Sequence, residues 1–207
     1  MIFENFNIDF YENKINCILG KSGCGKTTLL YIISGVIQND TKDFKGIENV
    51  GISYIFQDDR LIEWLTVEDN IKLVIKKYYN EKEINELCDK YLKLVGIYEY
   101  KNYYPQRLSG GIRQRVNIAR AFIYPSKIII MDEPFKSIDI KNKMIIMDNF
   151  KEILQKDNRT VLFVTHDIEE AIYLGDSGVI LGDRPVEIKK VFDNIKGIDK
   201  ETISKYI

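Results

Sequence analysis

Residues 20–27 read Gly-Lys-Ser-Gly-Cys-Gly-Lys-Thr and lie between two segments of different character. Ile15–Leu19, just before them, is predicted to be a buried strand, and Lys26–Val36 shows the apolar spacing of a helix. The octapeptide fits the pattern G-x-x-x-x-G-K-[ST], which between a strand and a helix is typical of a loop that binds phosphate groups. A glycine-rich turn that holds a lysine by chance would not account for both flanking elements.

The residue types in this loop suit phosphate chemistry. Glycines let the backbone bend so that successive N–H groups converge on phosphate oxygens, and the following helix adds the positive end of its dipole. Lys26 is predicted to reach between the β- and γ-phosphates of a nucleotide, and the Thr27 hydroxyl is predicted to bind Mg²⁺. Cys24 is interpreted as a small residue tolerated in the loop, because no histidine or cysteine partner is placed in sequence to activate it as a nucleophile. The predicted nucleotide contacts are Gly20, Lys21, Ser22, Gly23, Cys24, Gly25, Lys26, Thr27 and Thr28.

Length and composition restrict the class of protein that carries this loop. The 207 residues fit one domain, or one core with an inserted subdomain. Thirty basic and 31 acidic residues give a formal net charge of −1, which does not indicate a nucleic-acid-binding surface. The longest apolar runs fall far short of the ~20 residues of a membrane span, and no signal-peptide pattern is seen. The three cysteines indicate reduced thiols in a cytosolic compartment. Work at a membrane would therefore require another chain to hold this one there.

Strand-like and helix-like segments alternate at both ends of the chain, whereas residues 66–124 show helical spacing throughout. We therefore expect an α/β core formed by residues 1–65 and 125–207, with residues 66–124 inserted as a helical subdomain. Residues 11–14 are predicted to form a tight turn in which Asn13 takes a positive φ. The other predicted strands are Phe6–Phe10, Ile52–Phe56, Ile128–Met131, Thr160–Thr165, Gly178–Leu181 and Val186–Val191. The other predicted helices are Met144–Leu154 and Asp167–Leu174.

A second glycine-containing motif, Leu108-Ser-Gly-Gly-Ile-Arg-Gln-Arg-Val116, opens a predicted helix that runs to Phe122. Ser109 and the N–H groups of Gly110 and Gly111 would form another anion-binding helix N-terminus. Taken alone, Ser-Gly-Gly before a helix is more often an N-cap and a turn. The motif becomes informative only together with the phosphate-binding loop and the polar residues that follow two later strands.

Polar residues directly follow those two apolar strand candidates. Asp132 and Glu133 end the run Lys127–Met131, which places a carboxylate at the carboxyl edge of a parallel sheet, where ligands of such sheets bind. Asp132 is predicted to hold Mg²⁺ through water, and Glu133 to orient and polarise an attacking water. An acidic pair at a strand end is elsewhere often only a helix-capping turn. His166, the only histidine of the chain, follows another strand candidate, although a lone histidine is usually a surface or core residue.

These motifs together resemble, in order and over nearly the whole chain, those of the ATP-binding-cassette (ABC) family. The resemblance implies a P-loop NTPase (RecA-like) α/β core with an inserted helical subdomain, hydrolysis of ATP, and Mg²⁺ as the cofactor. It implies that His166 contacts the γ-phosphate and positions the water, so the expected catalytic residues are Glu133, His166 and Lys26. Gln57, in Tyr54-Ile-Phe-Gln57, matches the family's Q-loop and is expected to contact both nucleotide and Mg²⁺. The expected metal ligands are Thr27, Gln57 and Asp132.

The resemblance also implies a second copy of the chain. In the family, two cassettes hold two ATP molecules between them, and hydrolysis lets the pair reopen. Loop 20–27 of one copy would then face Ser109, Gly110 and Gly111 of the other. Residues 137–139, Ser-Ile-Asp, match the family's D-loop, and Asp139 is expected to reach the nucleotide of the other copy. Only the resemblance carries this expectation, because sequence separation does not show which residues meet.

Phe56–Asn70 resembles the corresponding stretch of importers for nitrate, sulfonates, taurine and related small anions. Leu162–Leu174 and the following Asp183-Arg-Pro185 strengthen this likeness, although the Leu-Pro-Trp usual in such importers is here Ile62-Glu63-Trp64. The resemblance implies integral-membrane permease partners, an extracytoplasmic substrate-binding protein acting indirectly, and a position at the cytoplasmic face of the membrane. Because those partners select the transported substrate, the sequence of this chain does not identify it.

Trp64, the only tryptophan, has two interpretations. It lies either near a groove that receives a permease helix or under the helical subdomain as a packing residue. Leu61, Ile62 and Leu65 beside it would extend an exposed apolar patch, which marks partner sites.

Several rival classes share part of this pattern. The cassette of an exporter or lipoprotein-release system, or a soluble ATPase of an assembly machine, would carry the same ATPase motifs. An ABC protein of chromosome maintenance would have hundreds of coiled-coil residues between Gly25 and Asp132, and a translation factor of the family would have two cassettes. A binding module without enzymatic activity would have lost Glu133 or His166, and both are intact.

The amino terminus departs from the family pattern. The family's adenine-stacking aromatic residue lies on a first strand that this sequence does not have, and Val36–Ile52 is short, so we expect a small antiparallel β region trimmed on both sides. Neither Phe3 nor Tyr11 occupies the matching position. A start codon assigned too far downstream is the alternative explanation. Since stacking on a base is worth about 1–3 kcal/mol, we expect weaker nucleotide binding and blunted discrimination between ATP and GTP.

Overall fold

The computed structural model describes residues 2–37, 45–46, 50–136, 138–155 and 158–207. The chain divides into two compact units. The first, here called the sheet unit, comprises Met1–Ile52, Lys127–Glu133 and Asp157–Ile207. The second, the helical unit, comprises Ser53–Ser126 and Pro134–Lys156.

A largely parallel β-sheet forms the centre of the sheet unit. Its parallel strands are β1 (Ile15–Gly20), β3 (Ile128–Asp132), β4 (Thr160–Val164) and β5 (Ser177–Leu181). Every residue of β1, β3 and β5 is buried, and buried parallel strands have continuous apolar runs of this kind. β6 (Ile188–Phe192) pairs antiparallel with β5 at one edge. With β2 (Ile52–Ile55), the strand order is β2-β3-β4-β1-β5-β6.

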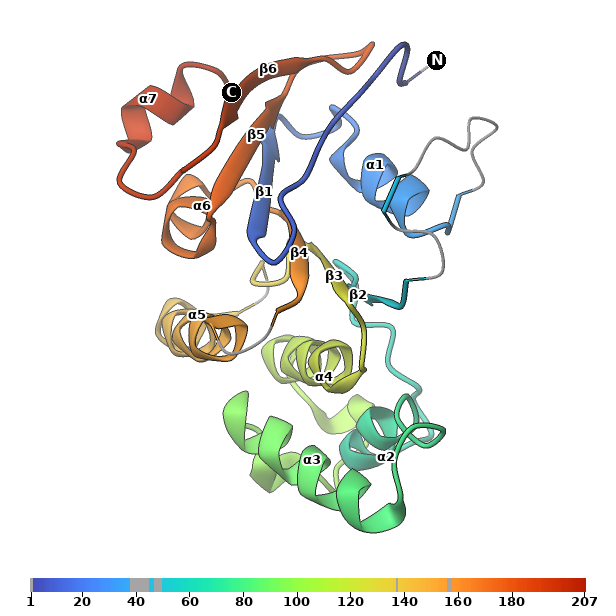
Figure 1. Ribbon diagram of the computed structural model, residues 1–207. Coiled ribbons are helices and arrows are strands. Elements are labelled where there is room, and N and C mark those ends of the chain that lie inside the picture. The colour runs from blue at the N-terminus through green and yellow to red at the C-terminus, as the bar shows by residue number, and fades with distance from the viewer. Residues whose placement is uncertain (1, 38–44, 47–49, 137, 156–157) are drawn as a thin grey trace. The chain divides into compact units, whose positions relative to one another are not determined.

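Helices cover both faces of this sheet. α1 (Lys26–Ile33) lies on one face, and α6 (Ile168–Leu174) and α7 (Lys200–Ser204) lie on the other (Figure 1). α1 buries Leu29, Leu30 and Ile33 against the strands. On the opposite face, α6 buries Ala171 and Leu174. The result is an α/β layer arrangement.

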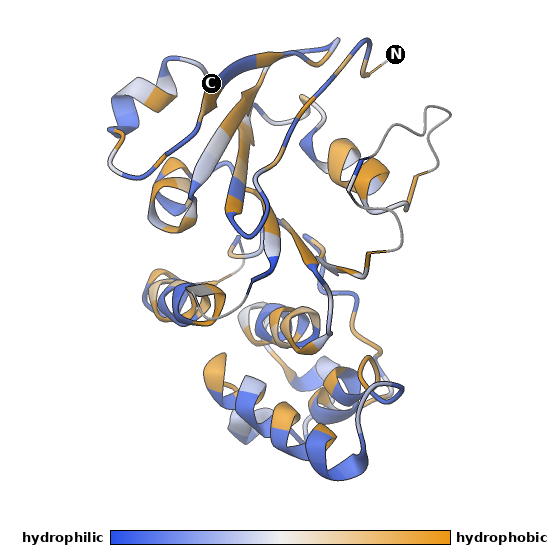
Figure 2. Ribbon diagram, in the orientation of Figure 1, coloured by the Kyte–Doolittle hydropathy of each residue, from blue (hydrophilic) through white to orange (hydrophobic). Residues whose placement is uncertain are grey.

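The helical unit contains α2 (Val67–Lys72), α3 (Glu81–Leu94), α4 (Gly110–Ile123) and α5 (Ile140–Gln155). Two short 3₁₀ turns, η1 (Tyr98–Tyr100) and η2 (Pro105–Arg107), connect α3 to α4. Figure 2 shows the amphipathic character of α3, which is hydrophilic with hydrophobic residues at intervals. A stack of rings forms part of this unit's core: Phe150 lies 4.3 Å from Phe122 and 5.6 Å from Phe135, between ring centroids.

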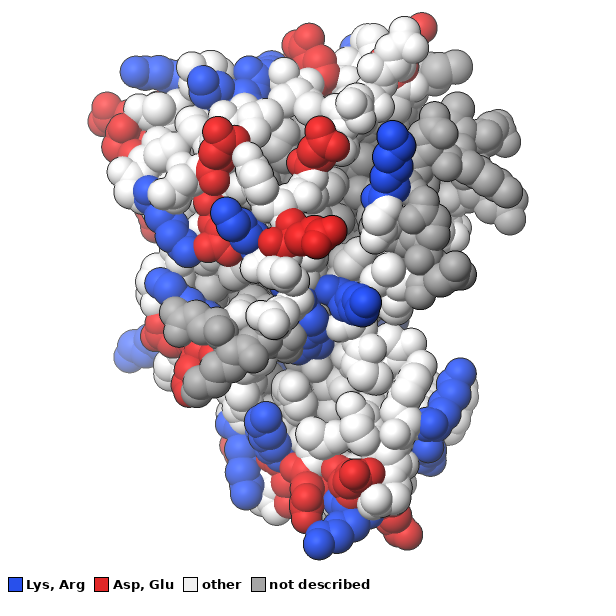
Figure 3. Space-filling model, in the orientation of Figure 1, with Lys and Arg blue, Asp and Glu red and all other residues white. Residues whose placement is uncertain are grey.

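The surface carries both signs of charge. Basic and acidic side chains are interspersed over the described part of the face in Figure 3. Within the described residues, no helix has the length and apolarity needed to cross a membrane. Cys17, Cys24 and Cys88 are free and buried, and burial raises the pKa of Cys88 to about 12.

Apart from the strand at Phe6–Phe10, the predicted helices and strands are confirmed in kind, with shifted boundaries. α1 ends at Ile33 and not at Val36, because Gly35 takes a left-handed φ of 73° and its N–H bonds to Ile32 O, a usual helix C-terminus. β6 begins two residues later than predicted because the N–H of Val186 is directed to Ile2 O. α7 was not predicted, although Asp199, which caps it, is the kind of signal that could have revealed it.

The strand predicted at Phe6–Phe10 is wrong. Its side chains alternate between half-buried and exposed, as predicted, but the segment forms no ladder of strand hydrogen bonds with the residues that the structure describes. Alternation therefore reflects a segment that lies along the surface. The positive φ predicted for Asn13 is confirmed, at 56°. Most of the stretch between Val36 and Ile52, where a trimmed β region was expected, lies outside the described residues.

The boundaries predicted for the inserted subdomain remain a prediction. The helical unit contains α2, α3 and α4 as that prediction has it, and also α5. Residues 66–124 are not helical throughout, since turns and 3₁₀ segments separate α2, α3 and α4.

The side chain of Asn16 links the segment before β1 to strands β4 and β5 by hydrogen bonds. Its side chain is 2% exposed and makes five hydrogen bonds. The amide Nδ2 donates to the carbonyls of Tyr11, Lys14 and Val161, and Oδ1 accepts from the Tyr11 N–H and the Ser177 hydroxyl.

We predict that Asn16→Ala lowers the free energy of unfolding by about 2–4 kcal/mol, because it leaves several buried polar groups without a partner. Asn7→Ala, at an exposed position, is the matched control and should change it by less than about 0.5 kcal/mol. Urea unfolding followed by circular dichroism measures both. Equal effects of the two substitutions would contradict the role assigned to Asn16.

Candidate active site at the carboxyl edge of the sheet

β3 and β4 end at the same level, and their neighbour β1 continues for two residues beyond that level, to Gly20. Ile18 of β1 pairs with Val164 of β4, and Val164 pairs with Asp132 of β3. The loop 20–25, the pair Asp132-Glu133 and the segment Thr165-His166 follow these strand ends directly. The register therefore brings three of the predicted site segments together at one edge of one sheet, where α/β proteins bind ligands.

The glycine loop depends on backbone conformations that favour glycine. Gly20, Gly23 and Gly25 have φ values of 149°, 80° and 123°. A Cβ on Gly20 would lie 2.6 Å from the carbonyl oxygen of Leu181, and one on Gly25 would lie 3.0 Å from the Val186 side chain. The path of the loop therefore requires glycine at Gly20 and Gly25 for close approach as well as for φ.

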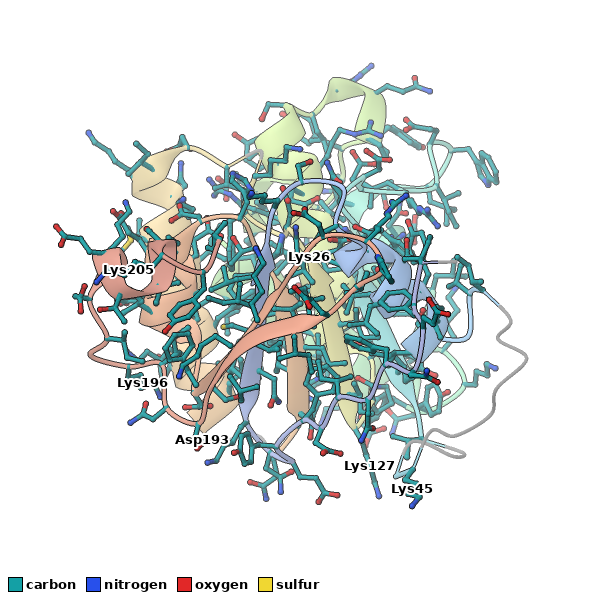
Figure 4. The ribbon with its side chains drawn as sticks, turned by 90° about the horizontal axis from the view of Figure 1, so that it is seen from above. Lys26, Lys45, Lys127, Asp193, Lys196 and Lys205 are labelled. Carbon is teal, nitrogen blue, oxygen red and sulfur yellow. The ribbon has the colours of Figure 1, made fainter. Side chains whose placement is uncertain are left out.

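Lys26 lies folded over this loop. Its side chain comes from the first turn of α1, where Figure 4 labels it, and it is 7% exposed. Nζ donates to the carbonyls of Gly20 at 2.7 Å and Lys21 at 2.8 Å, and it lies 3.9 Å from Cys24 Sγ. A cation is thus fixed beside the loop N–H groups and the N-terminus of α1, as a phosphate site requires. Thr27 and Thr28 follow it and are half-buried, whereas Lys21, Ser22 and Gly23 are exposed.

Two acidic residues end β3, and they differ in environment. Asp132 is 2% exposed. Glu133 has a left-handed φ of 46°, and its N–H donates to Val164 O at 2.9 Å. This bend directs the Glu133 side chain away from the line of the strand. Its Oε2 lies 3.1 Å from Nδ1 of His166, so the structure brings together the two residues predicted to act on water.

The turn that carries His166 is held by a buried pair. Thr165 is 1% exposed, and its hydroxyl donates to Glu170 Oε2 at 2.7 Å and accepts from the Asp167 N–H at 3.0 Å. Asp167 in turn caps α6 by accepting from the N–H groups of Glu169 and Glu170. Sequence reasoning missed Thr165 and Glu170. The capping residue Asp167, three positions before a glutamate, was the available signal.

Oxygen donors at this edge suit Mg²⁺. Thr27 offers a hydroxyl and Asp132 a carboxylate, which are hard ligands of the type that Mg²⁺ prefers. No cluster of three or more acidic, histidine or cysteine side chains that would cage a metal occurs in the described part of the chain. This donor set fits an ion held by one carboxylate, a hydroxyl and the phosphates of its substrate.

The remaining predicted site residues belong to the helical unit. Gln57, Ser109 and Gly110 are exposed, and Gly111 is half-buried. α4 begins at Gly110, where the motif predicted a helix start, and Ser109 is its N-cap, with a hydroxyl that accepts from the Ile112 N–H. Contact of these residues with nucleotide remains a prediction.

Asp139 lies at the start of α5. It accepts hydrogen bonds from the backbone N–H of Asn142 at 3.1 Å and from its side chain at 2.6 Å. These bonds hold the pKa of Asp139 below its usual value. Its structural role here is to cap the helix, and its predicted contact with a second copy stays a prediction. Ser137 lies outside the described residues.

The aromatic residues near the amino terminus lie in different places. Phe3 packs against Phe6, and its ring lies 3.5 Å from where a Cβ on Gly25 would be. The Tyr11 hydroxyl instead donates to Asp193 at 2.6 Å. The expectation that the chain lacks the family's adenine-stacking aromatic residue remains a prediction.

Gly20→Ala tests whether the loop path is fixed by close approach. Gly35→Ala is its matched control, because Gly35 also has a positive φ, at 73°, but open space where Cβ would be. We predict that Gly35→Ala costs about 1–2 kcal/mol of backbone strain. Gly20→Ala should cost clearly more, since the backbone at Leu181 must also move. Equal urea midpoints for the two variants would show that the loop accommodates a Cβ at Gly20 without a movement of β5, and would contradict this prediction.

Comparison with known proteins shows the family of the chain. Residues 3–136 match the ABC transporter family. An uncharacterized ABC transporter ATP-binding protein of Methanocaldococcus jannaschii is 39% identical over 91% of this chain and 73% of its own length. Aliphatic sulfonates import ATP-binding proteins of Pseudomonas syringae and Bacillus anthracis are 37% and 36% identical, over 89% and 93% of this chain and 77% and 78% of their own lengths.

Solved structures of cassettes share the fold. A dimeric bacterial ABC transporter cassette superposes with a TM-score of 0.82 at 31% identity, covering 95% of this chain and 92% of that one. A cassette dimer in a post-hydrolysis state, bound to ADP and Pi, gives a TM-score of 0.80 at the same identity and coverage. These matches confirm the predicted P-loop NTPase fold class. The chain therefore belongs to the ABC transporter family and is one of its ATP-binding, ATP-hydrolysing cassettes.

Proposed function

We propose that this ATPase energises a membrane importer for a small anion of the aliphatic sulfonate class. The observation that supports its chemistry best is the register of the neighbouring strands β1, β4 and β3, whose carboxyl ends bring the segments that carry Lys26, Asp132, Glu133 and His166 to one edge of the sheet. The import direction and the substrate class rest on relatives named as aliphatic sulfonates import ATP-binding proteins.

The residues at this edge have different roles in ATP hydrolysis. Lys26, with the N–H groups of loop 20–25, binds and neutralises the β- and γ-phosphates. Thr27 and Asp132 would hold Mg²⁺, which when bound spreads the developing negative charge of the phosphates. Gln57 is proposed as a further nucleotide and metal contact.

Glu133 and His166 act on the attacking water. Glu133 accepts a proton from that water while the water oxygen forms a bond to the γ-phosphorus. At the same time the bond between the γ-phosphorus and the β–γ bridging oxygen breaks. His166, 3.1 Å from Glu133, orients the carboxylate and approaches the γ-phosphate. Thr165 and Glu170 fix the turn from which His166 projects. A carboxylate that is placed by its backbone and by one neighbour suits a general base.

A second copy of the chain would complete each site. The exposed start of α4, with Ser109, Gly110 and Gly111, presents N–H groups that can bind the γ-phosphate of the other copy's ATP. Asp139 would lie at the same junction. The dimeric state of the related solved cassettes supports this arrangement.

The proposed membrane partner is a permease, with an extracytoplasmic binding protein acting through it. Trp64 is 79% exposed, which argues against the alternative that it packs inside the helical unit. Leu61, by contrast, is buried. An exposed tryptophan beside α2 is suited to contact a partner.

Glu133→Gln tests the catalytic assignment. We predict that it keeps ATP binding, lowers turnover by about 100-fold or more, and accumulates an ATP-bound dimer visible by size exclusion, because only the proton acceptor is lost. Lys26→Ala should instead abolish ATP binding. The controls are Glu187→Gln and Lys189→Ala, which change exposed side chains of β6 and the turn before it. Wild-type turnover in Glu133→Gln would contradict the role of Glu133 as base.

The importer assignment predicts ATP-driven uptake of a sulfonate. The chain should copurify with an integral-membrane permease, and vesicles containing the complex should accumulate a labelled alkanesulfonate only with ATP and its binding protein. ATP-driven export from the vesicles would favour the exporter class. Copurification with soluble proteins alone would favour an assembly ATPase.

A further inference from the structure

One polar face of α4 holds the segment Phe56–Glu63, here called the tethered segment. Arg113, Asn117 and Arg120 recur at four- and three-residue steps and therefore share that face. Asn117 Nδ2 donates to Phe56 O at 3.2 Å. Arg120 donates to the carbonyls of Arg60 at 3.0 Å and Asp59 at 3.1 Å.

Arg113 makes the strongest of these contacts. Its Nε and Nη2 donate to the two carboxylate oxygens of Asp59 at 2.7 and 3.0 Å, and Nη2 also donates to Glu63 Oε1 at 2.6 Å. A planar guanidinium paired with two oxygens is the strong, direction-specific form of ion pair. The side chains of Arg113 and Asp59 are 22% and 24% exposed, so solvent screens this pair only in part.

The charges of this cluster are firmly fixed. Burial alone would raise the pKa of Asp59, but its hydrogen bonds from Arg113 and from the Leu61 N–H hold the pKa below the usual value. Hydrogen bonds to Asp59 and Glu63 raise the pKa of Arg113. The ion pair therefore persists throughout the physiological pH range.

The chain just beyond the tethered segment is fixed from the other side. Asn70 of α2 is fully buried, and its side chain accepts from the Ile62 N–H and donates to the carbonyls of Ile62, Leu65 and Thr66. Trp64 lies between these anchored positions and is 79% exposed. An exposed indole is thus carried on a backbone that has little freedom of its own.

Arg113 also belongs to the first turns of α4. Its backbone N–H donates to Ser109 O at 2.9 Å, whereas its side chain holds Asp59 and Glu63. One residue therefore joins the helix start that bears Ser109 to the segment that leads to Trp64. Every contact in this chain of bonds lies within the helical unit.

We propose that Arg113 is a positioning residue that makes the Trp64 surface and the Ser109–Gly111 helix start move as one body. This inference rests on the proposed function, in which Ser109–Gly111 contact the ATP of a second copy. A ligand or partner that displaces one end must then displace the other, and the effect is reciprocal. A partner that binds at Trp64 would thereby influence closure of the dimer, without any contact with nucleotide.

The single tryptophan provides a direct readout. In the Glu133→Gln background, addition of ATP and Mg²⁺ should form the dimer and shift the emission of Trp64. Arg113→Met should abolish that shift and raise the ATP concentration for half-maximal dimerisation by about fivefold or more. Arg113→Lys, which keeps the charge but not the paired geometry, should give an intermediate result. ATP affinity in the monomer, measured by calorimetry, should stay unchanged in all of them.

Two further variants serve as second probe and control. Asp59→Asn combined with Glu63→Gln removes the acidic partners and leaves Arg113, and it should reproduce Arg113→Met. Lys82→Met removes a cation whose ion pair with Glu86 is 3.9 Å long and whose side chain is 85% exposed, and it should leave the Trp64 shift intact.

The outcomes separate the two levels of proposal. Failure of the Glu133→Gln chain to bind ATP or to dimerise would overturn the proposed function and this inference with it. A normal dimer whose Trp64 emission does not change, or a shift that survives in Arg113→Met or in the double variant, would overturn the role of Arg113 alone. If Lys82→Met also abolished the shift in Trp64 emission, the cause would be the general loss of a surface charge and not the specific ion pair of Arg113.

Discussion

The site depends on the register of three neighbouring parallel strands whose carboxyl ends lie at one edge of the sheet. The pairings of Ile18 with Val164 and of Val164 with Asp132 decide where the glycine loop, the acidic pair and the histidine turn emerge. A slip of one residue in either pairing would reverse the faces of a strand and move its loop by about 3.3 Å. Because β1 and β3 are buried on both faces, their apolar side chains resist such a slip, and packing in the core thereby sets the geometry of the chemistry.

Much of this arrangement follows from local sequence. The pattern of loop 20–27 predicts its flanking strand and helix. The apolar run that ends in Asp132 predicts a buried strand with a carboxylate at its end. The start of α4 at Ser109 also follows from a single capping residue. These features depend on residue type and near neighbours, which a sequence displays directly.

Other features depend on partners far away in the chain. The alternation at Phe6–Phe10 is typical of a strand, yet none of the strands that the structure describes pairs with it, because pairing is decided by the neighbouring segment. The contact of Glu133 with His166 joins residues 33 positions apart and requires the parallel register and a left-handed φ at a non-glycine residue. The ion pair of Arg113 with Asp59 joins residues 54 positions apart, and no local pattern marks either residue as a member of a pair.

The hydrogen bonds that join the Lys26 ammonium to the glycine loop change the thermodynamics of phosphate binding. A free lysine carries about 2 kcal/mol of rotamer entropy, which it would ordinarily lose when it meets an anion. Here the carbonyls of Gly20 and Lys21 already restrain the ammonium, so that entropy is lost when the chain folds. An arriving phosphate therefore meets a cation that is already ordered and largely stripped of water. Its binding should depend little on side-chain ordering and mainly on how well the anion replaces the solvent that still reaches the loop.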